Sequence, residues 1–448
     1  MSISKDDEKK QDDHDVDPKL LEIQKLVALS KSFASVDPSA ISVSTLAGIT
    51  KLDLFDADLN SLPESLPKYL PNLSILFCMK NKFAQVPEVI GKCPKLQMVS
   101  FKSNEITSIH PEALQPQLRW LILTDNKIIS IPSTIGRCTK LQKFMMSGNC
   151  LSSIPKEIEN CHSLELIRLA SNQLSTPPME LLNLPKLSWC AFSGNPFIHQ
   201  GEDLSSVDEM HLQLFSEPKL DDPTQGTVLG KGASGVTRKY ELQIENDGKS
   251  EQVPVAVKEY YSNMTSDGSP QDERKVAMIA SSIGCKSLVH VLGKTSKGNL
   301  IMELLKNYSV LAEPPSLESC SRDVYEDGLK ISEARARAII GDLLYALMKL
   351  HEKGICHGDF YGHNILISDD TQDQIWLTDF GAAFLYDGQS DYGKLIVQIE
   401  KRAFLHLVNE VNSLVPETLQ ELKEKISQFS MAIPLKSFDE LHRQWKEV

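Results

Sequence analysis

A hydrophobic pattern with a period of about 23 residues runs through residues 46–200. Leucine and isoleucine recur in the frame L-x-x-L-x-L-x-x-N-x-L, as in LRWLILTDNKI from Leu118 to Ile128. Each copy carries one asparagine, and these are Asn81, Asn104, Asn126, Asn149, Asn172 and Asn195. An earlier copy has Ala57 instead, so we expect seven units with an atypical capping unit first. The pattern predicts short strands stacked into a solenoid, with each asparagine bonding neighbouring backbone, because no single unit buries its own apolar face.

Two rows of side chains should point outward from these strands and line the concave face. The first row is Ile75, Met98, Trp120, Lys143, Leu166 and Trp189, and the second is Phe77, Ser100, Ile122, Met145, Arg168 and Ala191. Large apolar residues dominate the first row, whereas a solvated concave face is normally polar. We therefore predict a protein partner, substrate or regulator, anchored on Ile75, Met98, Trp120, Ile122, Met145, Leu166 and Trp189. The alternative is that the chain's own tail or second domain covers this face.

Three cysteines, Cys93, Cys138 and Cys161, occupy one position of the repeat. They fall on separate coils and lack the paired spacing of a structural zinc site. Buried apolar thiols are the favoured interpretation. Nine cysteines in a chain of this size do not suggest a disulfide framework.

The second half of the chain mixes strand-like runs with long amphipathic segments. ISEARARAIIGDLLYALMKLHEKGI predicts a helix with Ser332 as its N-cap. Ahead of it, VLGKGASGV places Gly230, Gly232 and Gly235 in a G-x-G-x-x-G arrangement, and VAVK ends in Lys258. Glycine N–H groups can approach phosphates, and a lysine behind them can pair with the α- and β-phosphates. This context favours a phosphate site over a Rossmann dinucleotide site, because no acidic residue stands at the Rossmann spacing.

Two further motifs follow in order, ICHGDFYGHNILI with Asp359 and Asn364, and IWLTDFGAAF with Asp379. Together these motifs resemble a protein kinase catalytic domain over about residues 222–448. Repeats followed by an HGDxYxHN motif resemble a leucine-rich repeat protein kinase family. The resemblance implies an α/β repeat solenoid followed by an α+β bilobal protein-kinase-like domain.

The resemblance also implies roles for individual residues. Asp359 would accept the proton of the acceptor hydroxyl, while Asn364 and Asp379 would hold Mg²⁺. Glu273 would pair with Lys258, although Asp272 and Glu259 compete for that lysine. The ATP-binding residues would be Leu229, Gly230, Gly232, Gly235, Val236, Ala256, Lys258, Met302 and Glu303.

Several positions depart from the kinase pattern. Gly358 stands where many kinases have an arginine that pairs with an activation-segment phosphate, so control by that route is not expected. Tyr361 stands where serine/threonine kinases have a lysine that neutralises the γ-phosphate, and His363 either substitutes for it in part or is structural. No A-P-E follows DFG, and the chain soon enters the helix-like run YGKLIVQIEKRAFLHLVNEV. Glu400 in that run occupies the place of an aspartate common in kinases.

Charge and composition refine this division of the chain. The net charge of -13 is uneven, with 9 acids and 6 bases in residues 1–45, 12 and 15 in 46–200, and 39 and 26 in 201–448. The acid excess argues against a nucleic-acid binder, and no run approaches the ~18 apolar residues of a membrane span. The polar start of the chain predicts no secretory signal, so we expect a cytoplasmic protein. We expect an acidic disordered tail with a short helix (1–45), repeats (46–198), a linker (199–221) with a short helix over 205–215, and the kinase-like domain (222–448).

The leading hypothesis is an ATP- and Mg²⁺-dependent protein kinase, directed to Ser or Thr, whose repeats recruit a substrate or regulator. One alternative is a nucleotide-binding pseudokinase that acts as a scaffold. Another is a small-molecule phosphotransferase, because HGD with a short activation segment is similar to kinases of the aminoglycoside type.

Overall fold

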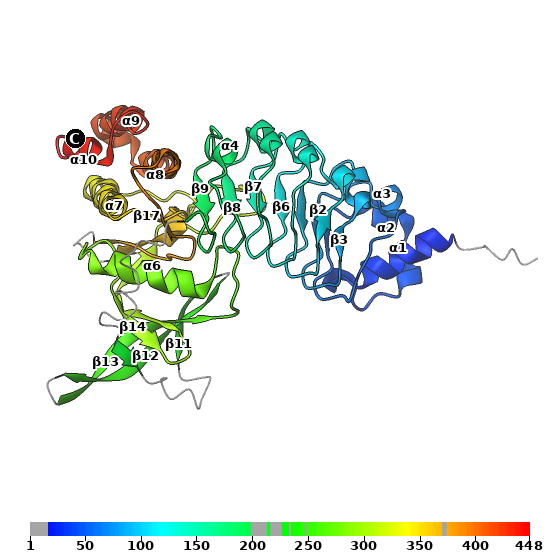
Figure 1. Ribbon diagram of the computed structural model, residues 1–448, viewed down its shortest axis with the longest axis horizontal. Coiled ribbons are helices and arrows are strands. Elements are labelled where there is room, and N and C mark those ends of the chain that lie inside the picture. Colours follow the sequence, from blue (N-terminus) through cyan, green and yellow to red (C-terminus); the bar gives the residue numbers. More distant parts are fainter. Residues whose placement is uncertain (1–16, 199–212, 216–225, 233, 247–248, 370–373) are drawn as a thin grey trace, which may run out of the picture.

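The computed structural model describes residues 17–198, 213–215, 226–232, 234–246, 249–369 and 374–448. It shows a curved repeat domain beside a two-lobed domain (Figure 1). The repeats begin at the far end of the molecule and their last units lie against the two-lobed domain. The end of the solenoid, rather than its start, is therefore placed to contact the second half of the chain.

Seven parallel strands form the concave sheet, in the order β1-β2-β4-β6-β7-β8-β9. Their bounds are β1 Lys51–Asp53, β2 Ile75–Phe77, β4 Met98–Ser100, β6 Trp120–Ile122, β7 Lys143–Met145, β8 Leu166–Arg168 and β9 Trp189–Ala191. Outside this sheet lie α3 Leu66–Tyr69, β3 Gln85–Val86, η3 Glu88–Lys92, β5 Ser108–Ile109, η4 Pro111–Ala113, η5 Ser133–Arg137, η6 Lys156–Asn160 and α4 Met179–Leu182. The strands pair residue for residue along both predicted outward rows. The prediction of seven units is confirmed.

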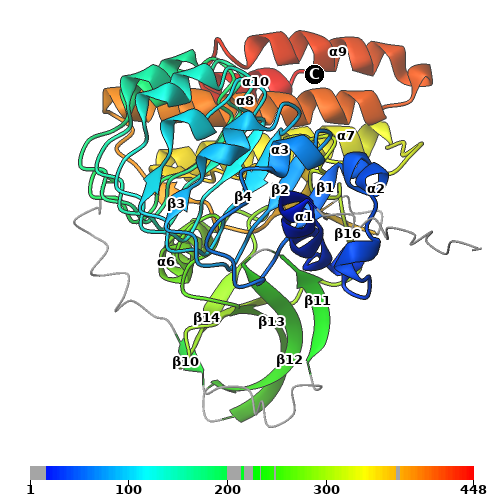
Figure 2. The same ribbon diagram turned by 90° about the vertical axis from the view of Figure 1, so that its right-hand side faces the viewer.

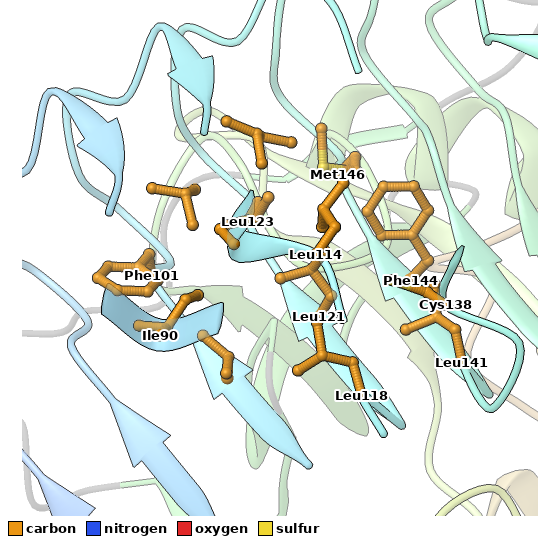
Figure 3. Close-up of a cluster of buried hydrophobic side chains, with 14 of the residues drawn as sticks. Ile90, Phe101, Leu114, Leu118, Leu121, Leu123, Cys138, Leu141, Phe144 and Met146 are labelled. Atoms are coloured by element: carbon orange, nitrogen blue, oxygen red, sulfur yellow. The ribbon is translucent and has the colours of Figure 1, made fainter. Parts of the chain in front are cut away.

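A ladder of buried asparagines holds the turns together. Asn126 shows the pattern, because its Nδ2 donates to Phe101 O and Leu123 O while its Oδ1 accepts from Ile106 N. The predicted contact of asparagine with neighbouring backbone is thus confirmed. Figure 3 shows part of the buried apolar cluster of the repeats, including Phe101 and Leu123 on successive units. Cys93, Cys138 and Cys161 are fully buried in the same core, and burial raises the pKa of each thiol to about 12.

Residues 17–48 form a helical cap on the first repeat (Figure 2). The cap consists of α1 Pro18–Ala28, η1 Lys31–Phe33, η2 Pro38–Ala40 and α2 Val43–Gly48. Ile23, Leu26 and Val27 lie on one face of α1 and join the core of the repeats. The short helix expected within residues 1–45 is present as α1, and the other described residues of this segment form further helical turns. The strongly charged residues 1–16, on which the expectation of a disordered tail rested, lie outside the described part of the chain.

The smaller lobe of the second domain is a six-stranded sheet, in the order β10-β14-β15-β13-β12-β11, with one helix. The elements are β10 Gln213–Phe215, β11 Thr227–Lys231, β12 Gly235–Asn246, β13 Lys249–Tyr260, α6 Pro270–Ser282, β14 Val291–Thr295 and β15 Leu300–Glu303. The helix predicted over 205–215 was wrong for its last three residues, because they form β10 and pair with β14. The rest of that prediction, and most of the 199–221 linker, falls outside the described residues.

The larger lobe is mainly helical. Its elements are β16 Tyr308–Val310, α7 Glu333–Glu352, β17 Ile355–Cys356, η7 Gly362–Asn364, β18 Ile365–Ser368, β19 Ile375–Leu377, β20 Phe384–Leu385, α8 Asp391–Leu414, η8 Glu417–Leu419, α9 Gln420–Ala432 and α10 Phe438–Trp445. Ser332 caps α7 as predicted, by accepting from Arg335 N. Among the helices in the described ranges, none is both long and apolar enough to cross a membrane.

Candidate active site

A buried lysine joins the two lobes of the second domain. Lys258 on β13 lies 2.6 Å from Glu273 Oε1 on α6 and 2.9 Å from Asp379 Oδ1. The two competitors have other partners, since Asp272 accepts from Ser269 Oγ at the start of α6 and Glu259 pairs with Arg238. Glu273 is therefore the partner of Lys258 on its helix.

Burial and charge act in opposite directions on these three groups. Burial works against a charged lysine, but Asp379 and Glu273 outweigh it and raise the pKa of Lys258. Burial raises the pKa of Glu273 to about 7 despite Lys258, whereas at Asp379 the lysine outweighs burial and lowers the pKa to about 2. At neutral pH the site therefore holds an ammonium beside an ionised Asp379.

Asp359 lies on the HGD loop, the name used here for residues 357–364. Asn364 Nδ2 donates to Asp359 Oδ2 at 2.9 Å and to Asp359 O at 2.8 Å. Glu400 on α8, which is 1% exposed, accepts from the backbone N–H groups of His357 and Gly358. The loop is thus fastened from within by Asn364 and from below by a buried carboxylate.

The three glycines lie at the tip of the β11–β12 hairpin. A Cβ at Gly230 or Gly232 would meet nothing within 4 Å, so the space beside these two glycines is open. Gly232 N donates to Gly235 O at 3.0 Å, which closes the tip of the hairpin. At Gly235 a Cβ would lie 2.2 Å from Glu259 O, so only glycine allows β12 to approach β13 here. Behind the hairpin, Ala256 pairs with Met302, and Val236 is buried on β12. Leu229 lies where the β11–β12 register shifts, and Glu303 ends β15.

Asn364 and Asp379 are the residues that would hold a divalent cation. Thr378, next to Asp379, donates through both its N–H and its hydroxyl to Asn364 O at 2.9 Å, which ties the two residues together. Asn364 uses its amide nitrogen on Asp359, which leaves the side-chain oxygen as the donor atom for a cation. No group of three or more His, Cys, Asp or Glu residues within the described ranges could hold a metal by itself. Mg²⁺ would take one or two protein oxygens here and complete its shell with water and phosphate.

The concave face of the repeats docks on the HGD loop. Trp189 on β9 stacks on Tyr361 with ring centroids 4.2 Å apart and planes 6° apart. Its indole N–H donates to Phe360 O at 3.0 Å, and the side chain is 1% exposed. Leu166 and Trp189 belong to the same buried cluster as Phe360 and Tyr361.

The contact with the repeats also explains why residue 358 is a glycine. Cys190 N, on β9, donates to Gly358 O at 3.1 Å. A Cβ at Gly358 would lie 2.2 Å from Cys190 O, and the residue has φ of 72°. Glycine is therefore required here because the backbone of the repeats approaches the loop too closely for a side chain.

Arg168 on β8 reaches furthest into the site. Its guanidinium donates to Asp267 Oδ1 at 2.7 Å, to Gly358 O at 3.1 Å and to Asp359 Oδ1. The residue is 2% exposed. Burial opposes the charge, but Asp359 and Asp267 outweigh it and raise the pKa of Arg168. The arginine is therefore a buried, permanent cation shared by both lobes.

Comparison with known proteins separates the two halves of the chain. The Protein kinase domain model matches residues 224–433, and the Leucine rich repeat model matches residues 116–174. The chain carries leucine-rich repeats followed by a protein kinase domain. The kinase domain is the two-lobed half, and its fold is the bilobal one that the motifs predict.

Solved structures give weaker similarities. A leucine-rich repeat protein of Leptospira interrogans is 23% identical, with 35% of this chain and 52% of that chain covered and a TM-score of 0.29. TLR13 in its complex with ssRNA13 is 20% identical (34% and 22% covered, TM-score 0.31), and the plant peptide hormone receptor RGFR1 with RGF2 is 29% identical (30% and 22%, TM-score 0.27). The chain thus spans about half or less of these structures, and such TM-scores carry no argument about function. Among the curated proteins, no match is found.

A second contact joins the repeats to the kinase segment before α7. Trp120 donates through its indole N–H to Cys320 Sγ, and Ser321 donates to Glu165. Arg322 pairs with the same Glu165 at 3.3 Å and lies over the ring of Trp189 at 5.0 Å. Two separate segments of the kinase domain, the HGD loop and residues 320–322, therefore contact the later repeats.

The predicted partner site needs correction at this end of the solenoid. Leu166 and Trp189 are buried against the kinase domain, and Met145 packs against the same cluster. The prediction of an external partner is therefore wrong for these three residues, for which the alternative of self-coverage holds. The physical reason is that Phe360 and Tyr361 of the HGD loop already bury the apolar surface of these side chains. Trp120 also contacts the kinase domain, through Cys320. Ile75, Trp120 and Ile122 are half-buried, and Met98 is 4% exposed.

Sequence reasoning missed the role of Arg168. It appeared only as a member of the second outward row. One signal was available, since Arg168 is the one charged residue in a row that otherwise holds Phe77, Ser100, Ile122, Met145 and Ala191. A buried charge requires a partner of opposite sign, and the acid excess of residues 201–448 offered one.

Proposed function

We propose that the chain is an ATP- and Mg²⁺-dependent protein kinase that phosphorylates a serine or threonine hydroxyl. The observation that carries the proposal is the contact of Lys258 with both Glu273 and Asp379. It brings together the lysine that would bind phosphate, its helix partner and the carboxylate that would bind the metal. Structural ion pairs also occur elsewhere, but these three lie beside an exposed glycine loop and the HGD loop.

Each residue then has a definite task in the transfer. Gly230, Gly232 and Lys258 would hold the phosphates of ATP, with the adenine against Val236 and Ala256. Mg²⁺, held by Asn364 and Asp379, would neutralise phosphate charge. Asp359 would orient the acceptor hydroxyl and take its proton.

The γ-phosphoryl group would pass directly from ATP to the acceptor, without a covalent intermediate on the protein. A bond forms between the acceptor oxygen and the γ-phosphorus, and the bond from that phosphorus to the β–γ bridging oxygen breaks. The proton passes to Asp359, and ADP leaves with the electron pair. The protein contributes positioning and electrostatics.

The test is phosphate transfer by the purified full chain beside Asp359→Ala and Asp379→Ala. We expect both variants to lose at least about 10²-fold in rate, since each removes a general base or a metal ligand. A rate of phosphate transfer that does not exceed background in any of the three proteins would refute the kinase proposal. Asp369→Ala, at the exposed residue that follows β18, is the matched control and should retain full activity.

One observation favours a second candidate. The repeats cover the HGD loop and pair with Asp359, an arrangement that also suits a nucleotide-binding scaffold without transferase activity. Nucleotide binding with no transfer to protein would support the scaffold. Phosphate on a metabolite but never on protein would support a small-molecule phosphotransferase.

A protein partner would use the part of the concave face that the kinase domain leaves free. Ile75 and Phe77 on β2 are half-buried there, and Phe55 is 39% exposed. Lys51 lies over the ring of Phe77, and Lys31 and Lys80 lie over the ring of Phe55. Such a mixed aromatic and basic surface suits an acidic substrate or regulator.

A further inference from the structure

We propose that Arg168 of the repeats is a positioning residue of the kinase active site, which supplies the cation that the HGD loop lacks and holds the Asp359 carboxylate for the acceptor hydroxyl. The inference rests on the proposed kinase function. It makes the leucine-rich repeats a part of the catalytic machinery, beyond any role in recruiting a partner.

The first argument is the fixing of both carboxylate oxygens. Asn364 donates to Oδ2 of Asp359, and Arg168 donates to Oδ1. Torsion about the Cβ–Cγ bond of Asp359 is thereby restrained from two sides, by one residue of the loop and one of the repeats. A general base must be held in one orientation to accept a proton efficiently.

The second argument is that Asp359 stays accessible. An ionised carboxylate has about four acceptor sites, and these two bonds use two of them. The side chain of Asp359 is 18% exposed, whereas that of Arg168 is 2% exposed. The arginine therefore approaches from the buried side and leaves room for a hydroxyl on the open side.

The third argument is that the loop is built around the guanidinium. Tyr361 holds the place where the kinase resemblance expects a lysine, and its ring stacks on Trp189 instead of offering a charge. His363 pairs with Asp323 at 2.7 Å, which gives it a structural role and removes it as the substitute. Arg168 also donates to Gly358 O. Each departure of the loop from the kinase pattern thus faces the repeats or is otherwise engaged.

The fourth argument is the link to the smaller lobe. Arg168 Nε donates to Asp267, which lies between β13 and α6, shortly before the helix that carries Glu273. One guanidinium therefore connects the HGD loop with the segment that leads into α6. The planar guanidinium of arginine carries several N–H donors in a fixed geometry and can bond several acceptors at once. The single ammonium group of a lysine cannot bridge the same set of acceptors.

The test compares Arg168→Met and Arg168→Lys with the wild-type full chain. Initial rates of transfer from ATP to a generic acceptor protein such as casein would give kcat and KM, and a fluorescent ATP analogue would give nucleotide affinity without turnover. We expect Arg168→Met to lower kcat on the order of 10²-fold, with nucleotide affinity unchanged within about twofold. Arg168→Lys should recover part of the loss. Arg119→Met, whose arginine bonds Gln142 within the repeats, is the matched control and should behave as wild type.

Different outcomes identify different failures. A kcat of Arg168→Met equal to or above that of the wild type would overturn the inference and make Arg168 a lock on the site. Equal losses in Arg168→Lys and Arg168→Met, together with a lowered melting temperature, would reduce the residue to a structural role. If the wild type and Asp359→Ala both transfer nothing, the proposed function fails by itself. In that case, amide hydrogen exchange over residues 356–364 still tests whether Arg168 holds the HGD loop. Exchange in Arg168→Met that is the same as in the wild type would show that it does not.

Discussion

At the scale of single residues, two departures from the kinase pattern have one explanation. Gly358 and Tyr361 look like losses when the HGD loop is considered alone. Against the repeats, Gly358 makes room for Cys190 O, and Tyr361 provides a flat surface for Trp189. These residues are therefore adapted to an intramolecular partner.

Gly358→Ala tests this explanation. The new Cβ would lie 2.2 Å from Cys190 O and 2.9 Å from Ala382 O, at a φ of 72° that alanine disfavours. Both oxygens belong to backbone, so neither can move aside as a flexible side chain would. We expect a loss of at least about 2 kcal/mol in the free energy of unfolding, measured by denaturant titration.

Gly388→Ala is the control for this experiment. It lies 30 residues further along, and its Cβ would meet only a carbon of Tyr386 at 3.8 Å, an ordinary contact. Its stability should stay within about 0.5 kcal/mol of the wild type. A Gly358→Ala variant as stable as Gly388→Ala would contradict the close approach of the two domains.

At the scale of elements, the asparagine ladder shows why the repeats could be predicted from the sequence. Each asparagine hydrogen-bonds backbone groups of its own unit and of the unit before it. The spacing between asparagines therefore equals the number of residues in one repeat unit. Asn126 bonds Phe101 O, Leu123 O and Ile106 N, all of which are otherwise buried from water. Local periodicity therefore contained the strand positions and even their register.

Asn126→Ala should be costly for the same reason. It leaves Ile106 N without its side-chain partner, and it removes one of two amide bonds from Phe101 O and Leu123 O, which keep those from Asn104 and Asn149. A buried unpaired group costs about 1–3 kcal/mol, and each lost hydrogen bond adds to that cost. We expect a drop of roughly 3 kcal/mol in the free energy of unfolding, by thermal or denaturant unfolding. Asn183→Ala, whose exposed amide bonds only Met179 O, should lose less than about 0.5 kcal/mol. A similar cost for both variants would argue against the ladder.

The elements that sequence reasoning misjudged depend on contacts over long distances. A short helix was expected within residues 1–45, but not that Ile23, Leu26 and Val27 of α1 would join the core of the repeats. Glu273 could not be separated from Asp272 and Glu259 by spacing alone, because only the packing of α6 against β13 selects it. The docking of β8 and β9 on the HGD loop joins residues about 190 positions apart, and no periodicity records such a contact.

At the scale of the whole molecule, the two domains share their hydrophobic cores. Leu166 and Trp189 of the repeats belong to the kinase cluster. In turn, Phe384 and Ile396 of the kinase domain belong to the cluster of the repeats. The pair is also matched in charge, with three more bases than acids in residues 46–200 and thirteen more acids than bases in residues 201–448. A shared core predicts that the domains unfold together.

Trp189→Ala tests this coupling. The variant removes the stack on Tyr361, the bond to Phe360 O and a buried side chain, and truncations of this kind cost about 3–5 kcal/mol. Calorimetry of the wild type should show one cooperative transition, because the unfolding of either domain would expose buried core residues of the other. In Trp189→Ala the weakened interface should split it into two, with the kinase domain melting first, since its HGD loop is left without cover. Phe55→Ala, at the far end of the concave face, should keep the single transition, and two transitions already in the wild type would show that the domains are only loosely joined.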